Sequence, residues 1–166
     1  MLGIQYGTYS CKLLVLDPRG RLQYKAFITH GNGSLSSAHA EPIMREASLQ
    51  AQVKRKLTKE LMADCHVQVM AHFHRPVIVS PYQSLYLTDN GIKIKQQYHA
   101  DADPRAKYIP EDLRWHIAVP GFVRKYSKDT KTSGYVERAG LAPAELGFLV
   151  SKSVGGRTVH VEKRLV

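Results

Sequence analysis

Three histidines follow the ends of two candidate strands, at positions where they could bind a metal ion. Residues 25–29 form a hydrophobic run that ends at His30, and residues 66–71 form a second run that is followed by His72 and His74. If the two runs are parallel strands of one sheet, their carboxyl ends lie at the same edge, where ligands of such sheets bind. Imidazole suits several divalent transition metals. The sequence therefore predicts that His30, His72 and His74 hold a divalent metal, with Mn, Zn or Fe as candidates.

The elements that must position these histidines follow from local patterns. Residues 11–29 predict a hairpin, because the turn at 17–20 contains Pro and Gly at positions that β-turns favour. A helix is predicted from Pro42 to Met62, where apolar residues recur near helical spacing. These apolar residues are Ile43, Ala47, Leu49, Val53, Leu57 and Leu61. Strand, helix and strand in this order are typical of a parallel crossover, so residues 1–76 predict a layered α/β unit.

The remainder of the chain, 77–166, is expected to be rich in β-hairpins. Asn90-Gly91 predicts a tight hairpin turn, because both residues tolerate positive φ. A last hairpin is predicted between Phe148 and Glu162. The other expected elements are strands at 77–80 and 84–87 and a short helix at 135–141, while 112–119 fits no element clearly. We expect residues 1–166 to form a single α/β domain.

Charge and composition indicate the class of partner. The formal net charge is +10, from 24 Lys and Arg against 14 Asp and Glu, which favours a phosphate ester or a nucleic acid. The residues predicted to contact phosphate or nucleic acid are Lys54, Arg55, Lys56, Arg75, Arg124 and Lys125. The alternative for each cluster is a solvated surface. The two cysteines lie in apolar runs and predict reduced thiols in a cytoplasmic compartment, and no run is long enough to predict a membrane span.

Other kinds of catalytic site have little support in the sequence. No Gly-x-Ser-x-Gly elbow, phosphate-binding loop or Cys-x-x-Cys pair is present. Asp64 and His66 match an Asp-x-His pattern, but they precede the strand that ends near His72. We therefore expect Asp64 at the opposite end of that strand, as a cap and not as a ligand. Asp101 and Asp103 are interpreted as solvated loop acids.

Two of these segments resemble the last two motifs of the calcineurin-like metallophosphoesterases. Ile28-Thr29-His30-Gly31 resembles a hydrophobic strand that ends in His-Gly, and Ala71-His72-Phe73-His74 resembles a strand that ends in Gly-His-x-His. The tail resembles bacteriophage-type members through 108–115 and 142–148. The resemblance implies a layered β-sandwich with flanking helices. It also implies that His30 and His72 bind one metal ion and that His74 binds another.

The chain departs from the pattern of this family before His30. The family's Asp-x-His, Gly-Asp-x-x-Asp and Gly-Asn-His motifs are absent, and Ala71 stands where the family has Gly. The chain thus resembles the C-terminal half of the family's domain. We expect a metal-dependent phosphoesterase, or an incomplete subunit whose acidic motifs come from a second chain. Exposed strand edges would then favour such a partner or a homo-oligomer.

Two further functions stay open at this point. The chain could be a truncated relative with a weak metal site and no catalysis. It could also be a non-catalytic basic protein derived from the same fold, which binds nucleic acid or serves in assembly. Salt-dependent binding to nucleic acid would distinguish this function from that of a phosphoesterase.

Overall fold

The computed structural model describes residues 7–59, 62–73, 75–98, 102–120, 145–154 and 158–165. Within these ranges the chain forms nine strands, one α-helix and one short 3-10 helix. Their bounds are β1 Ser10–Leu16, β2 Leu22–Thr29, α1 Pro42–Lys59, β3 Val67–Met70, β4 Val77–Val79, β5 Leu85–Asp89, β6 Ile94–Tyr98, η1 Glu111–Leu113, β7 Trp115–Ala118, β8 Gly147–Val154 and β9 Thr158–Leu165.

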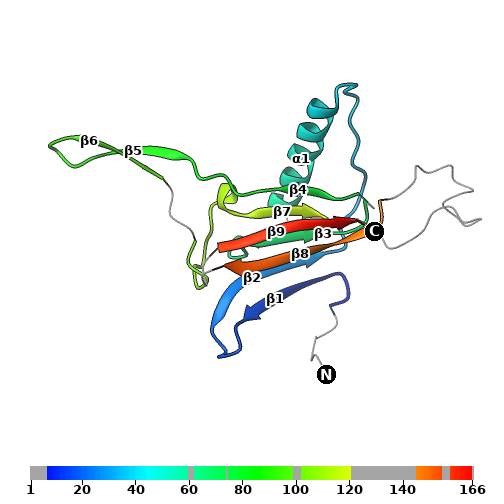
Figure 1. The fold of residues 1–166 in the computed structure, drawn as a ribbon, viewed down its shortest axis with the longest axis horizontal. Helices are drawn as coiled ribbons and strands as arrows, with labels where there is room; N and C mark the ends of the chain where they lie inside the picture. The colour runs from blue at the N-terminus through cyan, green and yellow to red at the C-terminus, as the bar shows by residue number, and fades with distance from the viewer. Residues whose placement is uncertain are drawn as a thin grey trace, which may run out of the picture.

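A five-stranded sheet with the order β1-β2-β3-β7-β4 forms the centre of the molecule (Figure 1). Strands β2, β3 and β7 are parallel, while β1 and β4 pair antiparallel at the two edges. The β2–β3 register runs from Ala26 opposite Val67 to Thr29 opposite Met70. The predicted parallel crossover is therefore confirmed, and the two strands end side by side.

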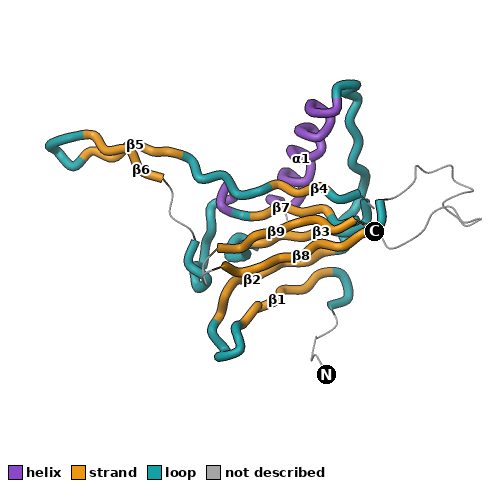
Figure 2. The backbone as a smooth tube through the Cα atoms, viewed as in Figure 1, coloured by secondary structure: helices purple, strands orange, loops and turns teal. Residues whose placement is uncertain are grey.

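The two faces of this sheet carry different layers (Figure 2). On one face, α1 packs on β3, β7 and β4 through Leu49, Val53 and Leu57. On the opposite face lies the β8–β9 hairpin, which contributes Val161 and Leu149 to a second apolar cluster. Because strand side chains alternate between faces, Met70 joins the first cluster and the neighbouring Val69 joins the second.

The predicted helix is correct in position but not in its buried face. Leu49, Val53 and Leu57 are buried as expected. Ile43 is 75% exposed and Ala47 is also exposed, because the first turns of α1 project past the sheet (Figure 1). The apolar residues therefore keep their helical spacing for about two turns beyond the sheet face that could bury them.

The second half contains one central strand that the sequence left undefined. Strand β7 comes from 112–119 and lies between β3 and β4, so β4 pairs with β7 and not with the strand that follows it. The Asn90-Gly91 hairpin is confirmed as β5–β6, with φ of +80° at Gly91. The last hairpin is confirmed as β8–β9. The short helix predicted at 135–141 lies outside the described residues.

The observed architecture confirms the fold class at the level of mixed α/β. Trp115 is 9% exposed and belongs to the core. Cys11 and Cys65 are both free thiols. No helix among the described residues is long and apolar enough to cross a membrane.

Candidate metal site and adjoining cavity

Two of the three predicted ligands meet at the carboxyl ends of β2 and β3. His30 follows Thr29 directly, and its amide donates to the carbonyl of Tyr9 at 3.0 Å. The amide of Ala71 donates to the Thr29 carbonyl at 3.1 Å, which extends the β2–β3 pairing up to His72. The parallel register therefore carries both histidines to the same edge of the sheet.

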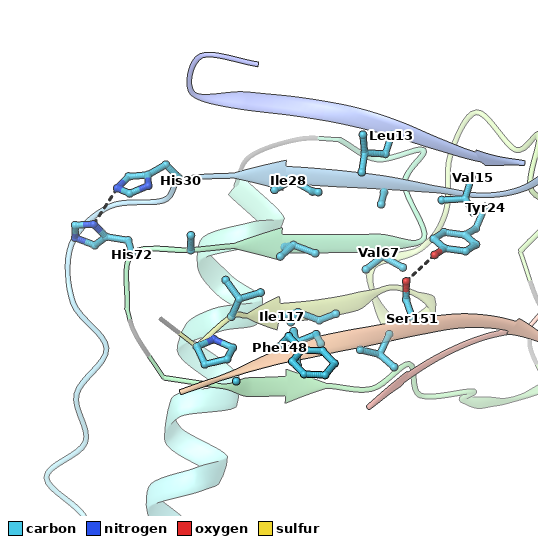
Figure 3. A pocket seen from close by; sticks show the side chains of 18 residues that line it. Leu13, Val15, Tyr24, Ile28, His30, Val67, His72, Ile117, Phe148 and Ser151 are labelled. Carbon is cyan, nitrogen blue, oxygen red and sulfur yellow. Dashed lines mark hydrogen bonds between the residues drawn. The ribbon is translucent and has the colours of Figure 1, made fainter. Parts of the chain in front are cut away.

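The two imidazoles contact each other directly (Figure 3). His72 Nδ1 lies 3.2 Å from His30 Nε2, and the ring centroids are 5.1 Å apart with an interplanar angle of 75°. Both side chains are exposed. Two ring nitrogens at this distance can share one proton, or they can face a common ligand.

An unusual backbone turn brings His72 back toward His30. His72 has a φ of +77°, the only positive φ at a non-glycine position among the described residues. This conformation costs a side-chain-bearing residue on the order of 1 kcal/mol. Gly31, beside His30, also has a φ of +77°, and a Cβ there would lie 3.2 Å from the Met70 methyl group. The backbone on both sides of the pair is therefore constrained.

Three side chains surround the pair, and the sequence analysis singled out only one of them, Lys56. The ring of Tyr9 lies edge-on to His30 at 6.3 Å, and its hydroxyl donates to the Gly31 carbonyl at 3.3 Å. Phe73 packs edge-on against His72 at 5.8 Å. Lys56, a predicted phosphate contact, places its ammonium 5.6 Å from the centre of the Phe73 ring. Lys56 is therefore the predicted cation that the structure brings toward this edge.

The third predicted ligand, His74, lies outside the described residues, as do Arg124 and Lys125. Within the described ranges, no group of three His, Cys, Asp or Glu side chains is arranged to hold a metal ion. The described part of the site thus supplies two imidazoles.

The other predicted basic contacts that the structure describes are Lys54, Arg55 and Arg75, and each has its own surroundings. Lys54 pairs with Asp112 at 2.5 Å. Arg55 is exposed on the helix. Arg75 is exposed and lines a small cavity of about 160 Å³ beside Arg45 and Lys163. A nucleic-acid-binding role for these residues stays a prediction.

A larger cavity adjoins the histidine pair, and nothing in the sequence pattern indicated it. It measures about 520 Å³ and lies between the five-stranded sheet and the β8–β9 hairpin. His30 and His72 line one end of it (Figure 3). Towards the other end, Tyr24 Oη and Ser151 Oγ are hydrogen-bonded at 2.6 Å. The cavity depends on the separation of two layers, which local periodicity does not determine.

The amino ends of β2 and β3 carry a different set of polar groups. Asp64 lies at this end, as predicted, and its carboxylate pairs with Lys25 at 3.0 Å and Lys12 at 2.5 Å. Burial raises the pKa of Asp64, but hydrogen bonds and charge from the two lysines outweigh it and lower this pKa to about 2. Asp64 is thus a partner of two lysines. Asp103 is exposed, as predicted, and Asp101 lies outside the described residues.

Two further histidines are buried near this amino end. His66 Nδ1 accepts from the Lys25 amide at 3.4 Å, and burial lowers the pKa of His66. His116 on β7 is fully buried, and neither ring nitrogen has a hydrogen-bond partner among the residues that the structure describes. Burial, reinforced by the charges of Lys54 and Arg114, lowers the pKa of His116 to about 4. Both imidazoles are therefore neutral at pH 7.

Comparisons with known proteins add nothing to this description. No family model, no curated protein and no solved structure matches the chain. The resemblance to metallophosphoesterases therefore stays a prediction that depends on the two histidine motifs.

Proposed function

We propose that the His30–His72 edge forms part of a divalent-metal site for phosphate-ester hydrolysis, in this chain alone or together with a second chain. The observation that supports this most is the 3.2 Å distance between His72 Nδ1 and His30 Nε2. With Zn–N bonds of 2.0–2.1 Å, two imidazoles on one tetrahedral ion have nitrogens roughly 3.3 Å apart. The two imidazoles could therefore bind a metal ion with little movement of their rings, because the ion would replace the proton that they share.

The surroundings of the pair suit an anionic ester. The chain carries a net charge of +10, which attracts anions. Lys56 provides an ammonium group 5.6 Å from the centre of the Phe73 ring. A divalent metal, when bound, would stabilise negative charge on phosphoryl oxygens. The chain's own residues then orient the ester at the sheet edge.

The proposal includes a second source of ligands. Two neutral imidazoles supply no negative charge, whereas two-metal hydrolases use carboxylates to neutralise the ions. No carboxylate of the described residues joins the pair in a three-ligand group. We therefore propose that acidic ligands come from a partner chain, or that the chain binds one metal with His74 and water.

Metal titration tests this function. We expect Zn or Mn to bind the full chain in isothermal titration calorimetry, with affinity falling about tenfold or more in His30→Ala and in His72→Ala, because each variant removes a ligand. His39→Ala is the matched control, since His39 is exposed, is not one of the predicted ligands and does not line the adjoining cavity. Equal affinity in all four proteins, or no binding to the unaltered chain, would contradict the proposal.

Turnover of an aryl phosphodiester with added Mn tests the catalytic part separately. We expect at most trace hydrolysis by the isolated chain, because acidic ligands are missing, and an increase when a partner that supplies them is added. Activity that persists in His72→Ala would show that the pair is not the site.

A further inference from the structure

The cavity beside the histidine pair has the volume of a ligand site. At about 520 Å³, it falls within the range of about 300–1,000 Å³ that small-molecule pockets occupy. It is bounded on one side by β1, β2, β3 and β7 and on the other by β8 and β9. The side chains of both layers leave this space unfilled, although protein interiors are normally close-packed.

The lining of the cavity selects an apolar occupant. Its walls are mostly aliphatic, with Val67, Val69 and Ile117 from the sheet and Leu149 from the hairpin. None of the described residues that line it is an Asp, Glu, Lys or Arg. The Tyr24 and Ser151 hydroxyls bond to each other at 2.6 Å, so they already have a partner. A sugar or a base buried here would leave polar groups unpaired, at a cost that an alkyl chain avoids.

The mouth of the cavity selects an anionic head group. His30 and His72 line this end, both residues are exposed, and His72 Nδ1 lies 3.2 Å from His30 Nε2. The positive net charge of the chain favours an anion at this exposed position. We propose that the cavity binds the alkyl chain of an amphipathic phosphate ester, with the phosphate at the His30–His72 pair.

This occupant fits the walls better than a segment of protein does. Side chains of both layers line the cavity, and most of the sheet side comes from β2, β3 and β7, which are interior strands without a free edge. A polypeptide inserted between them would bury backbone N–H and C=O groups without partners. An alkyl chain has no such groups. The inference rests on the proposed function for its phosphate head, while the alkyl site stands on the cavity itself.

A chain-length series on the unaltered protein provides the first test. Inorganic phosphate and butyl, hexyl, octyl and decyl phosphate are titrated below their micellar concentrations, with Trp115 fluorescence or calorimetry as the readout. We expect affinity to rise by roughly fourfold for each buried methylene, then to level off when the cavity is full. Equal affinity for inorganic phosphate and every ester would overturn the inference.

A pair of tryptophan substitutions locates the binding site. Val69→Trp places a large side chain in the cavity, while Leu14→Trp adds the same side chain to the outer face of β1, where Leu14 is 59% exposed. We expect Val69→Trp to lose the dependence on chain length and Leu14→Trp to keep it. Unchanged dependence in a folded Val69→Trp protein would overturn the inference. If that variant does not fold, the series on the unaltered chain decides.

Decanol separates this inference from the proposed function. Decanol carries the alkyl chain without the phosphate, so its binding should be lost in Val69→Trp and kept in His72→Ala.

If no metal binds but this pattern of decanol binding holds, the proposed hydrolysis fails and the alkyl site stands. If metal binds and decanol does not, the alkyl site fails and the metal site stands. If neither decanol nor decyl phosphate binds and Val69→Trp alters the sedimentation mass, the cavity is a contact between chains and the inference is wrong.

Discussion

The two ends of the β2–β3 pair carry polar residues in opposite arrangements. At the amino end, Lys25 is 7% exposed and donates both to Asp64 and to the Ala106 carbonyl. His66 bonds to backbone groups on both of its ring nitrogens. At the carboxyl end, His30 and His72 are exposed, and each imidazole contacts the other. The same two strands therefore have one buried, internally paired end and one open end.

This difference separates residues that stabilise the fold from residues that can bind a ligand. A buried lysine such as Lys25 needs its counter-ion, because an unpaired buried charge is costly. Removing an exposed imidazole pair should change the free energy of unfolding little. The backbone at His72 nevertheless keeps a strained φ. Strain at an exposed position is typical of sites where function, and not stability, selects the conformation.

The largest expected effect is the loss of Asp64 at the amino end. Asp64→Ala should lower the free energy of unfolding by about 3 kcal/mol, because it leaves Lys25 buried without a counter-ion. Urea denaturation measures this loss. Glu162→Ala is the matched control, since Glu162 pairs with Lys152 and Arg164, whose side chains are 53% and 58% exposed. A loss no larger than that of Glu162→Ala would show that the amino end is not stabilised by this pairing.

The same variant should change acid stability. The pKa of Asp64 in the folded chain is about 2, below its unfolded value. The stability that the carboxylate contributes is therefore complete above about pH 4 and is lost as the pH falls towards about pH 2. In Asp64→Ala, this part of the pH dependence should disappear.

The second effect concerns His116, which has a folded-state pKa of about 4. Below its unfolded pKa of about 6.5, the unfolded chain binds a proton that the folded chain does not, so stability should fall by about 2 kcal/mol between about pH 7.5 and about pH 5. His66 acts in the same direction. His116→Leu should flatten this fall and leave stability at pH 7 unchanged or higher, because it removes two buried nitrogens that have no hydrogen-bond partner in the described part of the chain.

Denaturation curves of both proteins across this pH range provide the measurement. His39→Leu is the matched control, because His39 is exposed and its loss should leave the fall in place. An identical slope in His116→Leu and in the unaltered chain would show that His116 is not buried in the neutral form.

The third effect tests the strain at the carboxyl end. Glycine adopts a φ of +77° freely, whereas alanine does not. His72→Gly should therefore be more stable than His72→Ala by about 1 kcal/mol, although both variants lose the imidazole. Thermal unfolding of the two variants compares them directly. Equal stability would indicate that the turn at His72 is not strained.

The smallest effect is expected at His30. His30→Ala should change the free energy of unfolding by no more than about 0.5 kcal/mol, because surface substitutions away from structural features have little effect. Its effect on metal affinity should be large in comparison. A loss of stability as large as that of Asp64→Ala would mean that both ends of the strand pair serve the fold.

Short-range patterns predicted the parts of the fold that depend on neighbouring residues. The Asp17–Gly20 turn forms as expected, since Asp17 Oδ1 accepts from the amides of Arg19 and Arg21 and Gly20 has a φ of +76°. The Asn90-Gly91 hairpin was also predictable from neighbouring residues, because both of its turn residues tolerate positive φ. The β2–β3 pair was predictable because a helix-length segment separates two hydrophobic runs.

The parts that the sequence did not predict depend on distant residues. Residues 115–118 form a four-residue strand that is buried on both faces, so they show no alternation, and only their insertion between β3 and β4 defines β7. At the site, Tyr9 reaches the His30 edge by way of β1, and Lys56 reaches it from the helix. The local pattern indicated which imidazoles meet but not their neighbours.

The β5–β6 hairpin should be the part of the central region where amide exchange and proteolysis begin. It projects from the body (Figure 1), and Leu87, Ile92 and Ile94 on it are 69%, 89% and 68% exposed. A two-stranded hairpin without a buried face is marginally stable in water, so its amide protons should exchange far faster than those of β2 and β3. Limited trypsin digestion should first cleave at Lys93 and Lys95, and the two pieces should stay associated through the central sheet.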